Sequence, residues 1–384
     1  MPAFPTTGPE EIAALDKQAE AILGVFKARG YTRHEPAILQ PAQMFVDRSG
    51  EEIRRRTFEV TDPSGRELCL RPDLTIPTCQ WQVESGNPYP ARLCYHGLAF
   101  RHRPGDGPTQ FTQAGAELLG LEDRAAGDAE MLALSVEALR AAGLARFDMK
   151  IGDLGLFSTL VDALAVPAQW RGRLKRHFWR AGYFEVLLSR MVAGATSDAE
   201  RAIDALHGLD GAELHRAVEA LLDKEGDTPL GARTREEIVE RLMVQAADGA
   251  APRLDAAVAE IITRVLAVSG PAPAALEQIR TLTKSVAAKM ERPLLAMQAR
   301  LGALAALGVD PKSVRFAAHF GRNLEYYTGF VFEFWSRAAG APIEIAGGGR
   351  YDTLMESLGA PHGTAAIGIA IRSERLLTAR RGGK

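Results

Sequence analysis

Residues 91–120 read ARLCYHGLAFRHRPGDGPTQFTQAGAELLG, two apolar runs on either side of a loop rich in Gly and Pro at 104–108. Such runs around such a loop predict a β-hairpin, because Gly and Pro interrupt strands and favour turns. A second hairpin is predicted in TFEVTDPSGRELCLRPD at 57–73, where Pro63 and Gly65 stand at positions that a type I turn favours. The sequence therefore predicts an antiparallel sheet.

Helical patterns surround these hairpins. Residues 10–29 repeat apolar side chains at helical spacing, open with two acids after Pro9 and end before Gly30. A second helical pattern runs from about 121 to 145, and the stretch from about 154 to 310 is rich in Ala and Leu at helical spacing. Strand patterns return after it. The prediction is an α+β fold in which helices flank the sheet.

Three segments follow from this pattern. We expect the first part of a core at 1–165, a mostly helical insertion at 166–310, and the second part of the core at 311–384. A chain of 384 residues with 46% hydrophobic residues is long enough to bury such a core.

Composition excludes several classes of function. The net charge of −2 gives no overall electrostatic footprint for nucleic acid. Cys69, Cys79 and Cys94 form no CxxC pair, so we expect no disulfide framework and no metal site. The sequence has no apolar run of roughly 18 residues and its first residues do not resemble a signal peptide. We expect a cytoplasmic protein that needs no cofactor.

Polar residues inside apolar strands are the candidate binding groups. Gln113 and Glu117 stand four apart, so strand alternation puts both on one face. A buried carboxylate beside an amide suits a cationic amine or an imidazole N–H, although a self-contained core network explains the pair equally well.

Other polar residues lie next to strands. Asp73 and Thr75 follow a predicted strand, where they could reach an ammonium group or could simply cap a turn. Arg101 ends an apolar strand, and a buried cation there needs a carboxylate or a phosphate as partner. For Arg101 alone, a structural ion pair is the more common explanation. Arg375 opens a helix, a place that suits a phosphate or a purine.

Taken in order, these segments resemble the catalytic core of histidyl-tRNA synthetase, a class II synthetase. Residues 100–117 are similar to motif 2, residues 368–377 to motif 3, and Pro36 lies in a segment similar to the dimer-forming motif 1. RNLEYYTG at 322–329 resembles the histidyl signature RGLDYYxG, and AGGGRYDTL at 346–354 resembles AGGRYDxL.

The resemblance implies roles for the matching positions. The side chain and backbone groups of histidine would be bound from several segments, and the arginines of motifs 2 and 3 would be remnants of a nucleotide site. The histidine-binding residues would be Asp73, Thr75, Gln113, Glu117, Arg322, Tyr326, Tyr327 and Tyr351, and the vestigial nucleotide-binding residues Arg101 and Arg375.

The sequence also departs from the synthetases. Only Thr378 to Lys384 follow motif 3, so we expect no anticodon-binding domain. Arg103 stands where motif 2 has a glutamate, and the loop after it lacks the usual arginine. Asp73 and Leu74 replace a glutamate and a glycine of the enzymes. The residues that would contact histidine are retained. The residues that would bind tRNA, and some of those that would bind ATP, are missing.

That profile, and the segment RPDLT at 71–75, resemble the regulatory subunits of ATP phosphoribosyltransferase. The resemblance implies a non-catalytic subunit needed for the activity and histidine feedback of a short-form catalytic subunit, at the first step of L-histidine biosynthesis. It would bind L-histidine, form a homodimer and not bind tRNA. The alternatives are a truncated enzyme that activates histidine as an adenylate, and a tRNA charger whose anticodon domain lies on another chain.

Overall fold

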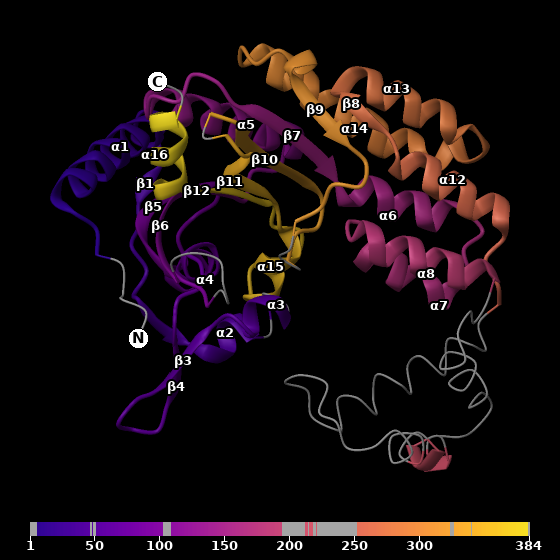
Figure 1. Cartoon of the computed structure of the whole chain (residues 1–384), viewed down its shortest axis with the longest axis horizontal. Coiled ribbons are helices and arrows are strands. Elements are labelled where there is room, and N and C mark those ends of the chain that lie inside the picture. The colour runs from indigo at the N-terminus through magenta and orange to yellow at the C-terminus, as the bar shows by residue number, and fades with distance from the viewer. Residues whose placement is uncertain are drawn as a thin grey trace. The chain divides into compact units, whose positions relative to one another are not determined.

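A computed structural model describes residues 6–46, 48, 51–102, 109–193, 252–322, 326–338 and 340–382, with a few residues between 212 and 220. Among these residues, nine strands form one mixed sheet in the order β1-β5-β6-β12-β11-β10-β7-β9-β8 (Figure 1). Its strands are β1 Thr32–Arg33, β5 Ala91–Phe100, β6 Gln110–Leu119, β7 Asp148–Asp153, β8 Ser269–Pro271, β9 Val314–Ala317, β10 Phe330–Ser336, β11 Ile343–Arg350 and β12 Ala366–Arg372.

The central strands confirm the predicted antiparallel sheet. The hairpin predicted at 91–120 is the antiparallel pair β5–β6, which continues through β12, β11, β10 and β7. Two outer pairings, β1 with β5 and β7 with β9, are parallel. Strands of two and four residues carry too little alternation for their direction to be predicted from sequence.

The second predicted hairpin is also confirmed, but it belongs to a separate small sheet. β3 Phe58–Thr61 and β4 Glu67–Leu70 pair antiparallel, and β2 Leu39–Pro41 joins them. The amide of Gly65 donates to the carbonyl of Asp62 at 2.9 Å, which closes the expected turn. The chain then returns towards the main sheet through residues 71–74.

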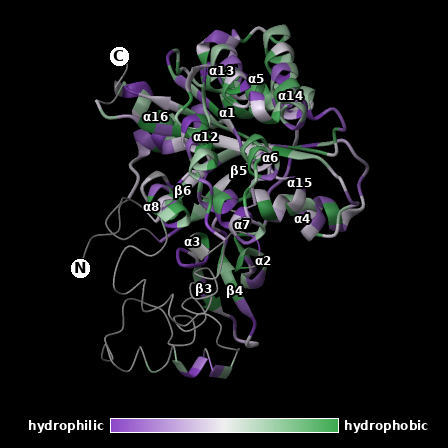
Figure 2. Ribbon diagram, turned by 90° about the vertical axis from the view of Figure 1, so that its right-hand side faces the viewer, coloured by the Kyte–Doolittle hydropathy of each residue, from purple (hydrophilic) through white to green (hydrophobic). Residues whose placement is uncertain are grey.

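Helices cover the main sheet on both faces. α1 Pro9–Ala28, α5 Arg124–Ala141, α14 Ala287–Ala306 and α16 Ser373–Gly382 pack together through the pairs α1–α5, α5–α14 and α1–α16, and α5 and α16 also contact the sheet. α4 Thr75–Ser85 and α15 Asp352–Ser357 pack against each other near residue 351. In Figure 2, α13 and α14 carry both hydrophobic and hydrophilic residues.

A buried ion-pair network ties α5 to the sheet. Arg350 of β11 pairs with Asp128 at 2.5 Å, and Arg300 of α14 bridges Asp128 and Asp153 at 2.5 and 2.9 Å. Burial raises the pKa of Asp128, and the two arginines oppose that rise. The network fixes α5 and α14 to the face of the sheet opposite to the site described below.

The described chain divides into two compact units, residues 1–157 with 267–384 and residues 158–266. The smaller unit contains most of α6 Leu154–Ala163, together with α7 Ala168–His177, α8 Ala181–Ala193 and α12 Ala256–Leu266. α13 Ala272–Leu282 and α14 belong to the larger unit, so the compact insertion is narrower than the segment 166–310 expected from composition. The larger unit also contains two short α-helices, α2 Ala42–Val46 and α3 Glu51–Arg54, and two short 3-10 helices, Lys284–Val286 and Pro311–Ser313. Among the described residues, no helix is both long and apolar enough to span a bilayer.

Candidate ligand-binding site

A small polar cavity of about 40 Å³ lies over β6, β11 and β12, between the segment that leads into α4 and the segment that leads into β10. Predicted site residues from both halves of the sequence line it: Asp73, Thr75, Arg101, Gln113, Arg322, Tyr326, Tyr327 and Tyr351.

Glycines let side chains lie directly on the sheet below this cavity. A Cβ atom at Gly347 would collide with the guanidinium of Arg322, and one at Gly368 would collide with the carboxylate of Glu117. Gly347 and Gly368 therefore make room for the protein's own polar side chains. This explains Gly347 in the strand sequence IAGGGR, whereas Gly348 and Gly349 lie close to backbone oxygens of Gly368 and Phe330.

Glu117 lies on β6 beneath the cavity and is fully buried. The hydroxyls of Tyr95, at 3.0 Å, and of Tyr351 donate to its carboxylate. Burial raises the pKa of Glu117 to about 7, against the opposing effect of these hydroxyl groups. Glu117 thus reaches the cavity through Tyr351 rather than forming its wall, and it can exchange a proton near neutral pH.

Two buried acceptor atoms at this end of the cavity have no hydrogen-bond partner within the described residues. They are Oδ2 of Asp73 and Oε1 of Gln113. The other oxygen of Asp73 accepts from the amide of Ile76 at 3.1 Å, so Asp73 caps the start of α4 and also presents an oxygen without a partner. Burial raises the pKa of Asp73, and Arg101 opposes that rise. We call Asp73, Gln113 and Glu117 the acceptor end.

Aromatic rings form the wall beside the acceptor end. The ring centroids of Tyr326 and Tyr327 lie 4.8 Å apart, and Tyr326 meets Tyr351 edge-on at 5.8 Å. Thr75 Oγ1 lies 3.3 Å from the hydroxyl of Tyr95, which joins Thr75 to the network around Glu117. These rings exclude water and offer faces on which a small planar ring could pack.

The opposite side, which we call the arginine end, has its charge neutralised by the protein itself, although Nε of Arg322 is buried without a hydrogen-bond partner among the described residues. Arg322 pairs with Glu344 at 2.9 Å and with Glu333 at 3.6 Å. Arg375 lies on α16 outside the cavity wall, where Nη1 donates to the carbonyl of Glu344 at 3.1 Å and lies 3.7 Å from its carboxylate. Burial acts to raise the pKa of Glu344, but Arg322 and Arg372 bring it below its ordinary value.

Arg101 has only partly the environment expected for it. Its Nε donates to the carbonyl of Pro72 at 2.7 Å, and its guanidinium lies 5.7 Å from the centre of the Phe111 ring. Arg372 lies over the same ring at 4.2 Å. Arg103 and the loop that follows it fall outside the described residues.

Sequence reasoning missed Glu344 and Arg372, which also line the cavity. Arg372 lies inside the segment similar to motif 3, so its position was a usable signal. Glu344 was not marked by any motif, because an acid near the start of a strand is usually exposed to solvent. Its importance arises only because residues 322, 344 and 375 meet in space.

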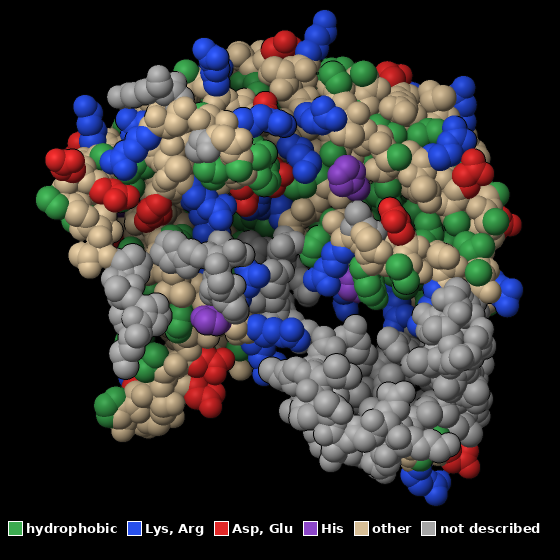
Figure 3. Space-filling model, viewed as in Figure 1, with side chains coloured by type: hydrophobic (Ala, Val, Ile, Leu, Met, Phe, Trp, Pro, Cys, Tyr) green, Lys and Arg blue, Asp and Glu red, His purple; other side chains and the backbone are tan. Residues whose placement is uncertain are grey.

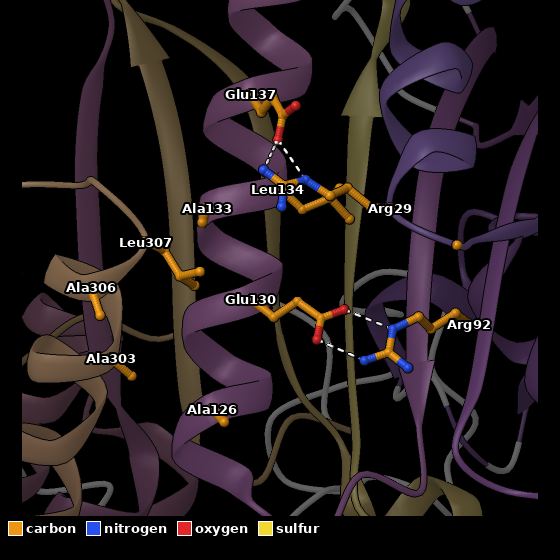
Figure 4. Close-up of a pocket in the computed structure, with 11 residues that line it drawn as sticks. Arg29, Arg92, Ala126, Glu130, Ala133, Leu134, Glu137, Ala303, Ala306 and Leu307 are labelled. Atoms are coloured by element: carbon orange, nitrogen blue, oxygen red, sulfur yellow. Dashed lines mark hydrogen bonds and ion pairs between the residues drawn. The ribbon is translucent and has the colours of Figure 1, made fainter.

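A larger groove of about 680 Å³ lies elsewhere, between α1, α5 and α14, and is drawn in Figure 4. Its charged residues point at one another: Arg29 pairs with Glu137 and Arg92 with Glu130, each at 2.8 Å. The hydroxyl of Tyr31 also donates to Glu130. Because these charges are already satisfied, the groove presents a weaker case for a polar ligand than the small cavity does.

Solved structures share this fold along almost the whole chain. A structure titled as an ATP phosphoribosyltransferase regulatory subunit/histidyl-tRNA synthetase from Bacillus halodurans covers 98% of the chain and 81% of its own, with a TM-score of 0.72 and 22% identity. Histidyl-tRNA synthetase from a Nostoc species covers 98% and 74%, with a TM-score of 0.64 and 19% identity. Fold and cavity therefore define a protein with a histidyl-tRNA synthetase-like core.

Sequence comparison narrows that class. The histidyl-tRNA synthetase family matches residues 4–248 and 216–376. An ATP phosphoribosyltransferase regulatory subunit from Brucella anthropi is 36% identical over 89% of this chain and 91% of its own. One from Agrobacterium fabrum is 35% identical over 94% and 96%. The chain belongs to the family of ATP phosphoribosyltransferase regulatory subunits, relatives of histidyl-tRNA synthetase.

Proposed function

We propose that this chain is the non-catalytic, histidine-sensing subunit of a short-form ATP phosphoribosyltransferase, at the first step of L-histidine biosynthesis. The observation that carries the proposal is the acceptor end of the cavity, where Asp73 Oδ2 and Gln113 Oε1 are buried without partners. Leaving buried acceptors unpaired costs about 1–3 kcal/mol each, which a ligand with suitable donors would recover.

L-Histidine carries the matching groups. Its ammonium fits Asp73 and Thr75, and an imidazole N–H fits Gln113 with the Glu117–Tyr351 pair behind it. The carboxylate fits Arg322, and the ring fits against Tyr326 and Tyr327. The cavity of about 40 Å³ is narrow for an amino acid, and we propose that binding moves side chains.

Regulation follows from that movement. Arg322 is the side chain best placed to move, because it can exchange Glu344 for the ligand's carboxylate. A ligand shifts an equilibrium only by binding one state better than another. We propose that the closed cavity and the histidine-filled cavity correspond to two states of the complex with different activity.

We also propose that this chain does not form an adenylate from histidine and ATP. A synthetase needs arginines free to bind ATP phosphates, whereas Arg322 and Arg375 both contact Glu344 in this chain. This supports binding without catalysis over a truncated enzyme that activates histidine. Histidine-dependent exchange of pyrophosphate into ATP is the discriminating assay, and we expect none above the background.

The partners follow from the family. We propose a homodimer through the synthetase-like core that joins short-form catalytic subunits in the cytoplasm and does not bind tRNA. Relatives that are named regulatory subunits support the catalytic partner.

The test is a titration. The rate of ATP condensation with phosphoribosyl pyrophosphate by the matching short catalytic subunit is measured with and without this chain while L-histidine is added. We expect the chain to change the rate and histidine to inhibit only the mixture. An unchanged rate and no feedback would refute the proposal.

A further inference from the structure

A second groove, of about 730 Å³, lies further along the same sheet. It is formed by β7, β8, β9 and β10 together with the turn Pro311–Ser313. We call it the basic groove, because the described residues that line it include four cations and one carboxylate, namely Lys150, Lys312, Arg315, Arg337 and Asp148. In Figure 3, Lys and Arg side chains gather over the strands labelled β7, β9 and β10 in Figure 1.

Two of these cations are not neutralised by the protein. Within the part of the chain that the structure describes, neither Lys312 nor Arg315 has a carboxylate at ion-pair distance, and both side chains are exposed. Arg315 Nε lies 3.2 Å from the hydroxyl of Ser269. Arg337 pairs with Asp148 at 3.1 Å at the solvent-exposed rim. The groove therefore keeps a positive charge in a chain whose net charge is −2.

Strand register places the basic groove on the same face as the ligand cavity. Glu333 stands opposite both Lys150 and Gly347, and Lys150 stands opposite Arg315. Paired residues on adjacent strands share a face of the sheet. The cavity over Gly347 and the groove over Arg315 thus lie on one surface, with β10 between them.

Glu333 connects the two. This buried carboxylate pairs with Lys150 of the basic groove at 3.2 Å and with Arg322 of the cavity at 3.6 Å. An anion that pairs with Lys150 would weaken the ion pair between Lys150 and Glu333. Glu333 would then bind Arg322 more tightly. Occupancy of the groove would change the freedom of Arg322 to meet a ligand carboxylate.

We propose that the basic groove is the docking surface for an acidic segment of the catalytic partner, an inference that rests on the proposed function. Charge complementarity favours this occupant, because two unneutralised cations attract a carboxylate-bearing segment. Trp335, Pro271 and Pro342 give the segment apolar surface between the charges. A nucleic acid fits less well, since it needs a long basic path and the chain as a whole is slightly acidic.

The experiment compares two pairs of charge reversals. Lys312→Glu with Arg315→Glu alters the groove, and Lys289→Glu with Arg292→Glu changes the net charge equally on exposed positions of α14. Binding of the purified short catalytic subunit to the full chain is measured at low and physiological salt. Histidine affinity and the thermal midpoint are controls for folding, because no altered residue lines the histidine cavity.

We expect the groove variant to bind the catalytic subunit about tenfold more weakly at low salt and to lose most of the salt dependence, and the α14 variant to bind within about twofold of wild type. Equal binding by wild type and groove variant would overturn the docking surface and leave the proposed function intact. A wild-type chain that does not bind the catalytic subunit would overturn both. Bulk tRNA that binds wild type and not the groove variant would show a nucleic-acid surface instead.

Discussion

The two ends of the ligand cavity differ in whether the protein itself provides partners for their charged and polar groups. At the acceptor end, Asp73 and Gln113 keep buried oxygens without partners. At the arginine end, Arg322 and Arg375 are already engaged by Glu344. An unsatisfied buried group favours a ligand, whereas a satisfied one must first lose a partner. Under the proposed function, this difference would let a synthetase-like core bind an amino acid without acting on ATP.

The largest expected effect is at the acceptor end, with Glu117→Ala. The substitution removes the acceptor for the hydroxyls of Tyr95 and Tyr351. We expect about a hundredfold loss of histidine affinity and about 3 kcal/mol of lost stability, since two buried donors become unpaired. Calorimetric titration and thermal unfolding measure these, and binding of the catalytic subunit should persist.

Glu130→Ala is the matched control for this change. Glu130 also accepts from a tyrosine hydroxyl, that of Tyr31 at 3.0 Å, but it lies in the groove of Figure 4. This variant should lose stability and keep wild-type histidine affinity. If both glutamate variants lowered histidine affinity equally, the effect would be one of general stability and the acceptor end would lose its special role.

Asp73→Asn should separate binding from stability. Asparagine keeps the oxygen that accepts from Ile76 but removes the charge that would face an ammonium group. We expect roughly tenfold weaker histidine binding, because hydrogen bonds to charged groups contribute about 1.5–3 kcal/mol. Burial raises the pKa of Asp73, so the neutral side chain should leave the unfolding temperature equal or higher. A lower unfolding temperature with unchanged affinity would mean that Asp73 is only a helix cap.

Glu344→Gln tests the arginine end. Removing this carboxylate leaves Arg322 with the more distant Glu333, so the ligand-free protein should unfold at a lower temperature. A histidine carboxylate can take the vacant place. We therefore expect histidine affinity to rise a few-fold, about 1 kcal/mol, and the stabilisation by histidine to be larger than in wild type.

Glu291→Gln provides the control for the arginine end. It removes a carboxylate from a surface arginine pair, Arg280–Glu291 at 2.8 Å, where little stability is at stake. Its unfolding temperature and histidine affinity should match wild type. Weaker histidine binding by Glu344→Gln would mean that Glu344 itself contacts the ligand and does not compete with it.

Sequence alone predicted the acceptor end better than the arginine end, and the reason is local. Gln113 and Glu117 are conspicuous because they interrupt an apolar strand. Because they stand four apart in the same strand, both side chains lie on the same face of the sheet. Glu344 becomes important only when three distant segments meet, which no local pattern encodes. The same limit applies to the fold: the long hairpins were predictable, whereas the direction of β1 and the allocation of α13 and α14 depend on tertiary packing.

The smallest expected effect is a pH dependence confined to the acceptor end. The pKa of Glu117 is raised by burial from 4.5 to about 7, so the folded protein keeps a proton that the unfolded chain releases. This bound proton contributes stability that is fully present below the pKa of Glu117 in the unfolded chain. That stability is lost as the pH rises through the pKa of Glu117 in the folded protein. Between pH 6 and 8 the loss should be roughly 1 kcal/mol relative to Glu117→Gln, which cannot titrate there. Denaturant unfolding of both proteins at these two pH values measures it, and parallel pH profiles would contradict a folded-state pKa near 7 for Glu117.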